Sequence, residues 1–313
     1  MARWLVLAAL LAFPLVVTLP FPRHIMIIIF LYATLAQAWN LLAGYCGQIS
    51  LGHAVFFGTG AYTSSVLVRD LALSPWLGMV AGALVAVALS QVIGYPVFRL
   101  HGHYFAIATI AVGEIVHIVA LNWDYLGAAR GLYLPIKRPD SFVNLQFHQS
   151  KAGYYYIALG LLLLALAVTR HLERSRAGYY FRAVREDPSA AASLGVPVTR
   201  YKQWAMAWSA ALTALGGTFY AQYVLFIDPE SVFALSLSIL ICLVAVLGGV
   251  GTLWGPLLGA AVLVPLSEGT RVWLGGTGKA IDLLIYGALI VIISVVQPAG
   301  VVGLVRRWRA RAA

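Results

Sequence analysis

Apolar segments about as long as a membrane is thick recur along the whole chain and limit what it can fold into. A helix that crosses the roughly 30 Å hydrocarbon core of a bilayer needs about 20 mostly apolar residues. Only 10% of the 313 residues are charged, against roughly 25% in soluble domains. The sequence therefore predicts an all-α, polytopic membrane protein, with residues 1–313 forming one transmembrane domain. The predicted spans are 4–20, 24–43, 53–69, 76–98, 104–123, 153–169, 203–223, 233–250, 256–274 and 281–298.

Basic residues predict how these spans are oriented. Lysine and arginine beside apolar spans are retained on the cytoplasmic side, and this rule accounts for the net charge of +10 better than nucleic-acid binding does. We expect both termini and the loop 170–202 to be cytoplasmic, and the loop 124–152 to be extracytoplasmic. The first apolar run lacks a small-x-small cleavage site, so we expect it to be a retained span and not a signal peptide.

Glycine is concentrated in two motifs, GYCGQISLGHAVFFGTGAY (44–62) and LGGVGTLWGPLLGAA (247–261). Each places a glycine-dense bend before a helix of small residues. In the second motif, Gly251, Gly255 and Gly259 lie four apart and predict a smooth stripe on which another backbone packs. Such bends at membrane depth also indicate broken or re-entrant helices, which need protein or a water-filled cavity to satisfy the freed backbone groups. Both interpretations stay open at this point.

Weakly polar side chains lie in and beside these bends. They suit the passage of a small solute with an apolar body and polar ends better than they suit an ion-selective filter. We therefore expect a translocation pathway, or its cytoplasmic gate, near the bends. The candidate residues are Gln48, Ser50, His53, Gly249, Gly251 and Gly255.

The motifs of catalysis and cofactor binding do not occur in the sequence. GGTGKA (275–280) is similar to a phosphate-binding loop, but Trp273 stands where the first glycine belongs and Ala280 where the magnesium-binding hydroxyl belongs. No hydrolase arrangement of Ser, His and Asp is found. We expect no enzyme activity, no metal and no cofactor on this chain.

Glu114 and His117 are three residues apart in a predicted span, so they share one face of a helix. An ionisable side chain at membrane depth is costly and marks a functional residue by default. The pair is either a proton relay or a buried, hydrogen-bonded pair that fixes helix packing, and the second interpretation is favoured. One Glu-x-x-His offers too few ligands for a metal site.

The predicted cytoplasmic loop contains the signals of a short helix, in EDPSAAASLGVP (186–197). Asp187 is a strong N-cap, Pro188 fits the first helical position, and Gly195 stands where a left-handed C-terminal cap belongs. These signals predict a helix over 188–194. Two turns are far below the roughly 12 to 15 residues that a helix in water needs to be even marginally stable, so something must hold it.

The apolar residues of this helix indicate what holds it. Ala190, Ala191 and Leu194 are expected to share one face and to form a strip that fits a groove on another protein or on this one. The flanking cations Arg182, Arg185, Arg200 and Lys202 could pair with an acidic rim. The alternative is a solvated loop that packs only on its own spans.

Three long motifs, in this order, resemble those of one known family. They are NLLAGYCGQISLGHAVFFGTGAY, FRAVREDPSAAASLGVPVTRYK and VLGGVGTLWGPLLGA, and the resemblance covers about Asn40 to Arg271. The family comprises the inner-membrane permease subunits of branched-chain amino-acid ABC importers, particularly the LivM type. Related permeases of this superfamily serve urea and short amides, and the motifs do not separate these substrates.

The resemblance implies a machine of several subunits in a bacterial inner membrane. It implies a second, LivH-type permease, two ATP-binding subunits that carry ATP and magnesium, and a periplasmic solute-binding protein. In such permeases the cytoplasmic loop carries a coupling helix that sits in a cleft of the ATP-binding subunit. Here that role falls to Arg185, Glu186, Asp187, Pro188, Ala190, Ala191, Leu194 and Gly195.

Two other classes of protein compete with this interpretation. A stand-alone, proton-coupled secondary transporter would use Glu114 and His117 to carry protons, but it has no general need for a capped cytoplasmic helix. A membrane scaffold that transports nothing would show no solute flux in its assembled complex.

Overall fold

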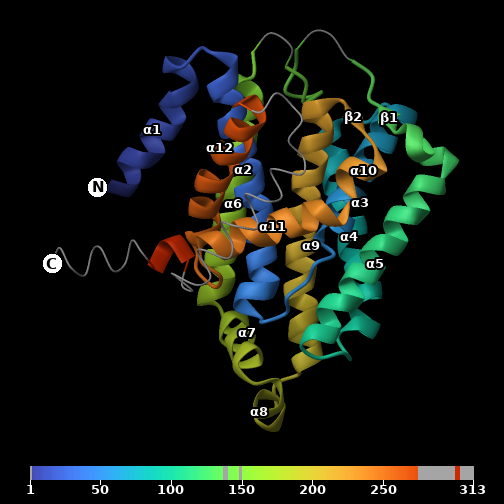
Figure 1. Cartoon of the computed structure of the whole chain (residues 1–313), viewed down its shortest axis with the longest axis vertical. Coiled ribbons are helices and arrows are strands. Elements are labelled where there is room, and N and C mark those ends of the chain that lie inside the picture. Colours follow the sequence, from blue (N-terminus) through green and yellow to red (C-terminus); the bar gives the residue numbers. More distant parts are fainter. Residues whose placement is uncertain (1, 137–139, 148–149, 274–299, 304–313) are drawn as a thin grey trace.

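The computed structural model describes residues 2–136, 140–147, 150–273 and 300–303, most of which are helical (Figure 1). The predicted span 281–298 and the basic C-terminal motif RRWRAR lie outside the described residues. Each of the other predicted spans falls on a helix, which confirms the all-α fold class. The helices are α1 (Ala2–Val16), α2 (Pro20–Asn40), α3 (His53–Asp70), α4 (Pro75–Val97), α5 (His103–Asn122), α6 (Ala152–Arg174), α7 (Arg176–Glu186), α8 (Pro188–Ser193), α9 (Val198–Val224), α10 (Pro229–Val232), α11 (Leu235–Gly248) and α12 (Gly255–Trp273).

Five segments within the described residues are both long enough and apolar enough to cross a membrane. They are Pro20–Tyr45, Pro75–Val97, His103–Asn122, Ala152–Arg174 and Pro229–Gly248. Helices α3 and α9 do not meet that criterion, because small and polar residues occupy many of their positions. Most of those residues are buried against other helices, so α3 and α9 meet protein over much of their surface and need less apolar character than a helix in lipid.

Glycines allow α3, α4 and α9 to pack with their backbones almost in contact. A Cβ atom on Gly60 of α3 would overlap the backbone of Ala214 in α9, and one on Gly217 of α9 would overlap the carbonyl of Phe57 in α3. The Thr218 hydroxyl uses this close approach to donate a 3.0 Å hydrogen bond to the Gly60 carbonyl. Small residues and interhelical hydrogen bonds of this kind are what hold helices together in a membrane.

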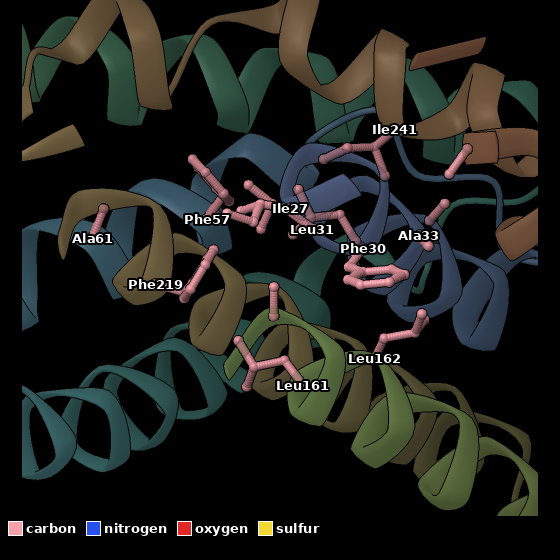
Figure 2. Close-up of a cluster of buried hydrophobic side chains, with 14 of the residues drawn as sticks. Ile27, Phe30, Leu31, Ala33, Phe57, Ala61, Leu161, Leu162, Phe219 and Ile241 are labelled. Atoms are coloured by element: carbon pink, nitrogen blue, oxygen red, sulfur yellow. The ribbon is translucent and has the colours of Figure 1, made fainter. Parts of the chain in front are cut away.

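The largest buried cluster joins helices that are distant in sequence. Figure 2 shows side chains from α2, α3, α6, α9 and α11 meeting there. Labelled members are Ile27, Phe30, Leu31, Ala33, Phe57, Ala61, Leu161, Leu162, Phe219 and Ile241. Lipid tails are as apolar as these side chains, so the cluster stabilises the bundle through close packing more than through removal from water.

The first glycine motif forms a re-entrant connection. After α2 the chain forms a five-residue π-helix, Leu41–Tyr45. The chain then turns back into the bundle, and α3 begins well above the lower end of α2 in Figure 1. The backbone groups freed there are paired with side chains of other helices. The amide of Leu51 donates to the Thr109 hydroxyl of α5 at 3.0 Å, and the amide of Ala54 donates to the Ser238 hydroxyl of α11 at 2.8 Å. A broken helix in a membrane requires such partners for the backbone N–H and C=O groups that the break frees.

The predicted span 233–250 is not one straight crossing. The chain forms the short α10, breaks at 233–234 and continues as α11, which lies across the other helices in Figure 1. Its 14 residues extend about 21 Å, less than the roughly 30 Å core of a bilayer. The whole segment Pro229–Gly248 is nevertheless long and apolar enough to cross a membrane, so the predicted span falls on an apolar helical segment that is broken once, between α10 and α11.

The second glycine motif packs α12 on α11. Gly259 of α12 lies against the carbonyl of Val244 in α11, and Gly255 lies against the carbonyl of Gly249. The expected close packing is confirmed at these two glycines. Gly251 does not continue the stripe, because it lies in the bend before α12 and has a φ of +75°.

The loop 124–152 is folded over the ends of α3, α4 and α9. It contains the short 3-10 helices Asp124–Leu126 and Ala128–Arg130. Its strand β1 (Leu132–Tyr133) pairs antiparallel with β2 (Phe226–Ile227), so that Leu132 faces Ile227. The Trp76 indole of α4 donates to the carbonyl of Phe142 at 2.6 Å. The described part of this loop therefore contains two helical turns and one strand of a small two-stranded sheet.

Adding one methyl group at the α3–α9 contact tests this packing. Gly217→Ala introduces a Cβ that overlaps the Phe57 carbonyl, and overpacking of this kind costs about 1 to 3 kcal/mol. We expect the thermal unfolding midpoint of the purified chain in detergent to fall by several degrees. Gly160→Ala is the matched control, since nothing lies within 4 Å of the added Cβ on α6. Equal midpoints for the two variants would contradict the close contact.

Candidate functional site

Helix α8 is capped at its N-terminus as the sequence predicts. The Asp187 carboxylate accepts hydrogen bonds from the amides of Ser189 at 2.7 Å and Ala190 at 3.1 Å. Pro188 occupies the first helical position, where its missing N–H costs nothing. These two features set where the helix begins.

A Schellman motif closes the C-terminus of α8. The amide of Gly195 donates to the carbonyl of Ala192 at 2.9 Å, and the amide of Val196 donates to the carbonyl of Ala191 at 3.0 Å. Gly195 has a φ of +82°, the left-handed conformation that glycine adopts without steric cost. The expected cap is confirmed, although the helix ends at Ser193 and Leu194 is the capping residue.

The three apolar residues of α8 do not share one face, so the expectation of a single apolar strip was wrong. Ala191 is only 3% exposed and belongs to the buried cluster that includes Phe181 and Val184 of α7. Ala190 is exposed, and Leu194 is 84% exposed. Ala191 thus holds the helix on its own chain, while Ala190 and Leu194 are exposed on α8, which lies at the lower end of the molecule in Figure 1.

Helix α7 was missing from the prediction, and it supports α8. It follows α6 after a break at Ser175 and buries Phe181 and Val184. The rings of Tyr180 and Phe181 lie 4.7 Å and 6.2 Å from the ring of Tyr201 in α9. Apolar residues at 177, 181 and 184 follow helical spacing, and this signal could have revealed α7 among the surrounding charges.

Arg185, near the end of α7, reaches the first glycine bend. Its guanidinium donates a 2.7 Å hydrogen bond to the carbonyl of Gly44 in the π-helix. The same guanidinium lies against Gly251, where a Cβ would approach its nitrogen to 2.7 Å. Arg185 therefore contacts both glycine bends and precedes the N-cap of α8 by two residues.

Asn40, the last residue of α2, joins the two bends directly. Its side-chain oxygen accepts from the amide of Gly251 at 2.7 Å, and its side-chain nitrogen donates to the carbonyl of Thr252 at 3.0 Å. Gly44 packs so closely against Asn40 and Gly251 that no side chain fits there. We call Asn40, Gly44, Arg185, Gly251 and Thr252 the bend junction.

The other glycines named from the sequence lie next to the bend junction. Gly249 ends α11 with a φ of +124°, and Gly255 begins α12. The Thr252 hydroxyl connects them, because it donates to the Gly249 carbonyl at 2.8 Å and accepts from the Gly255 amide at 3.1 Å. The three candidate glycines Gly249, Gly251 and Gly255 therefore lie close together in the bend around Thr252.

The polar residues of the first bend lie in different environments. His53 is fully buried, and its ring lies 2.7 Å from the Ser209 hydroxyl, which donates to the Ala38 carbonyl. Ser50 is 1% exposed and lines a small hollow with Thr109. Gln48 is half-buried. In this conformation His53 serves to hold α3 against α9 and α2, while Gln48 lies nearer to the surface.

Glu114 and His117 are close, but they are not a buried, hydrogen-bonded pair. The imidazole Nδ1 of His117 lies 3.6 Å from the Glu114 carboxylate, and its Nε2 lies 3.9 Å from the carboxylate of Glu230 in α10. His117 is buried, whereas the side chains of Glu114 and Glu230 are 54% and 68% exposed. Sequence reasoning missed Glu230, although Asp228-Pro229 before it repeats the helix-start signal of Asp187-Pro188.

The chain matches known proteins over most of its length. Residues 22–294 match the family described as the permease component of branched-chain amino acid transport systems. The high-affinity branched-chain amino acid transport system permease protein LivM of Salmonella typhimurium is 32% identical over 299 residues, which cover 88% of this chain and 68% of that protein. LivM of Escherichia coli matches with the same identity and coverage.

The LivH permease proteins are more distant relatives. LivH of Salmonella typhimurium is 25% identical over 288 residues, 87% of this chain and 91% of that protein. No solved structure matches the chain at a significant level.

Breaking the bend junction at Asn40 tests whether this side chain holds the two bends together. Asn40→Leu removes the partners of the Gly251 amide and the Thr252 carbonyl, a loss of about 1 to 3 kcal/mol for each unsatisfied group. We expect hydrogen–deuterium exchange at the Gly251 amide to become roughly tenfold faster or more. Asn122→Leu is the control, because the hydrogen bond that this amide donates stays within its own helix, at the carbonyl of Ile118. Unchanged exchange in the Asn40 variant would show that other contacts suffice.

Proposed function

The chain belongs to the family of permease components of branched-chain amino acid transport systems, and we propose that it forms one membrane-spanning subunit of an ABC importer for branched-chain amino acids. The observation that carries this proposal is the match of residues 22–294 to that family, together with the LivM relatives. The chain is a multi-pass membrane protein. A bacterial inner membrane with both termini cytoplasmic is the setting that the family and the distribution of Lys and Arg support.

The proposed partners follow from what the chain itself does not carry. The sequence has no complete phosphate-binding loop, so ATP and magnesium would bind to two separate ATP-binding subunits. A second permease of the LivH type would complete the pathway, and a periplasmic solute-binding protein would deliver the amino acid. The similarity of this chain to both LivM and LivH proteins supports a pair of related permeases.

Helix α8 is the proposed docking element for an ATP-binding subunit. It projects beyond the other helices in Figure 1, and Ala190 and Leu194 are exposed on it. The 84% exposure of Leu194 leaves a large apolar side chain that no described residue of the chain covers, and a partner would bury it. Both ends of α8 are capped by its own residues, so the helix can present this side chain in a defined position.

The bend junction is the proposed route from α8 to the pathway. Helices α7 and α8 meet at Asp187, and Arg185 of α7 bonds to Gly44 and packs against Gly251. Movement of α8 by an ATP-binding subunit would therefore shift α7 and both glycine bends together. A packed element with two discrete positions is the physical requirement for transmitting such a change. Gln48, Ser50 and Gly249, beside the junction, would then lie near the cytoplasmic gate.

The exposed face of α8 provides the first test. Leu194→Asp places a charge where the apolar contact is proposed, while leaving Ala191 and both caps in place. We expect the permease pair to assemble, to bind its ATP-binding subunits at least tenfold more weakly, and to lose leucine uptake in proteoliposomes. Leu100→Asp is the control, since Leu100 is also an exposed leucine on the predicted cytoplasmic side. Normal uptake by the Leu194 variant would overturn the docking role, and uptake of urea in place of leucine by the wild type would overturn the substrate.

Arg185 provides the second test, because it separates docking from transmission. Arg185→Ala removes the bond to Gly44 without changing α8. We expect the ATP-binding subunits to remain bound and to hydrolyse ATP. Leucine uptake per ATP should fall about tenfold, because the lost hydrogen bond involves a charged group and such a loss corresponds to about a factor of ten. Arg200→Ala removes an exposed cation nearby as the control. Equal coupling ratios in the two variants would exclude the proposed route.

A further inference from the structure

Glu114, His117 and Glu230 form a cluster whose composition points to a ligand. We propose that this cluster binds the ammonium group of the amino acid as it passes through the permease. The inference rests on the proposed function, and it adds the part of the solute that is recognised and the residues that recognise it. The cluster joins two elements, α5 and α10, that are more than 100 residues apart in the chain.

His117 lies between the two carboxylates without a hydrogen bond to either. The residue is 7% exposed, and neither ring nitrogen has a hydrogen-bond partner within the described residues. The nearest carboxylate oxygens are 3.6 Å away on Glu114 and 3.9 Å away on Glu230. A buried imidazole without partners is costly, so the cluster is incomplete in this conformation.

Counting donors and acceptors identifies what would complete it. An ionised carboxylate only accepts hydrogen bonds, and a neutral imidazole offers one donor and one acceptor. The cluster therefore has more acceptors than donors and a net negative charge, whether the imidazole is neutral or protonated. A primary ammonium group has three N–H donors and a positive charge, and it matches this deficit in both hydrogen bonding and charge.

The position of Glu114 indicates that the cluster does not face lipid. Glu114 lies within α5, one of the apolar candidate spans, yet its side chain is 54% exposed. A carboxylate facing the lipid core would cost about 2.5 to 3.5 kcal/mol. No Lys or Arg of the described chain forms an ion pair with Glu114 or Glu230. Such a residue normally faces water or another subunit, and a pathway between two permeases offers water and solute there.

The surroundings of the cluster also suit an amino acid with an apolar side chain. Ile115 and Ile118, beside Glu114 on α5, are 61% and 50% exposed. Two carboxylates bordered by exposed isoleucines can receive an ammonium group and an aliphatic chain at the same time. A bare metal ion would gain nothing from that apolar border, and it would need more oxygen ligands than this cluster provides.

Chemical labelling tests the proposed ligand directly. In an assembled importer with Cys46 and Cys242 replaced by alanine, Glu230→Cys is treated with a cationic and an anionic methanethiosulfonate reagent. We expect faster modification by the cationic reagent, because Glu114 remains, and we expect isopentylammonium to slow that modification. The carboxylate 4-methylpentanoate, which carries the same alkyl chain, should have no effect. Asp124→Cys, an exposed acidic position beyond the end of α5, is the control that neither compound protects.

Transport by conservative variants provides a second readout. Glu114→Gln and Glu230→Gln keep the size of each side chain and remove its charge. We expect leucine uptake at saturating solute-binding protein to fall about tenfold, the loss of one charge-assisted hydrogen bond, while ATP hydrolysis stimulated by that protein persists. Glu114→Asp should retain more uptake than Glu114→Gln, and Asp124→Asn should match the wild type.

Each contrary outcome has a distinct meaning. Unchanged uptake in both glutamine variants, or equal protection by 4-methylpentanoate, would overturn the ammonium site. Failure of those variants to assemble with the second permease would overturn it in favour of a contact between subunits. A wild-type importer that takes up no leucine would refute the proposed function instead, and protection by isopentylammonium would still report on the cluster.

Discussion

Backbone polar groups inside a membrane must find partners in the protein, and this constraint governs how the helices of this chain are broken. Three helical segments end or begin within the bundle, at the π-helix after α2, at the start of α3 and at the bend before α12. Side chains from other helices pair with the groups freed there, namely Arg185 at the π-helix, Thr109 and Ser238 at the start of α3, and Asn40 at the bend before α12. Because each partner comes from a distant part of the sequence, every break also joins elements to one another.

The bend junction follows from that constraint and explains why α8 and the bends belong to one structural unit. The carbonyl of Gly44 finds its partner in Arg185, which is two residues from the N-cap of α8. Ala191 meanwhile packs α8 on the cluster that includes α7. The same contacts that satisfy the backbone therefore connect the surface helix to the two glycine bends. His117 is one of several buried polar side chains of the described chain that lack a hydrogen-bond partner, together with Gln37, Tyr45, Tyr62 and Gln222. It differs from them because its imidazole lies between two carboxylates, those of Glu114 and Glu230.

The sequence by itself determined the elements whose signals are local. Apolar length predicted the helices of the bundle, and Asp187, Pro188 and Gly195 predicted α8 and both of its caps, because capping depends on neighbouring residues alone. The glycine motifs indicated either close packing or broken, re-entrant helices, and the sequence left these two interpretations open. Three motifs in order also indicated the family.

Tertiary structure decided everything that depends on which residues meet. Periodicity placed Ala191 with Ala190 and Leu194, but packing on α7 turned Ala191 inward. The apolar run 233–250 predicted one helix, but packing divides the segment into α10 and α11, and α11 lies across the other helices in Figure 1. Asn40 and Gly251, or His117 and Glu230, are more than 100 residues apart. Their pairing depends on how the helices pack, and no local pattern in the sequence records that packing.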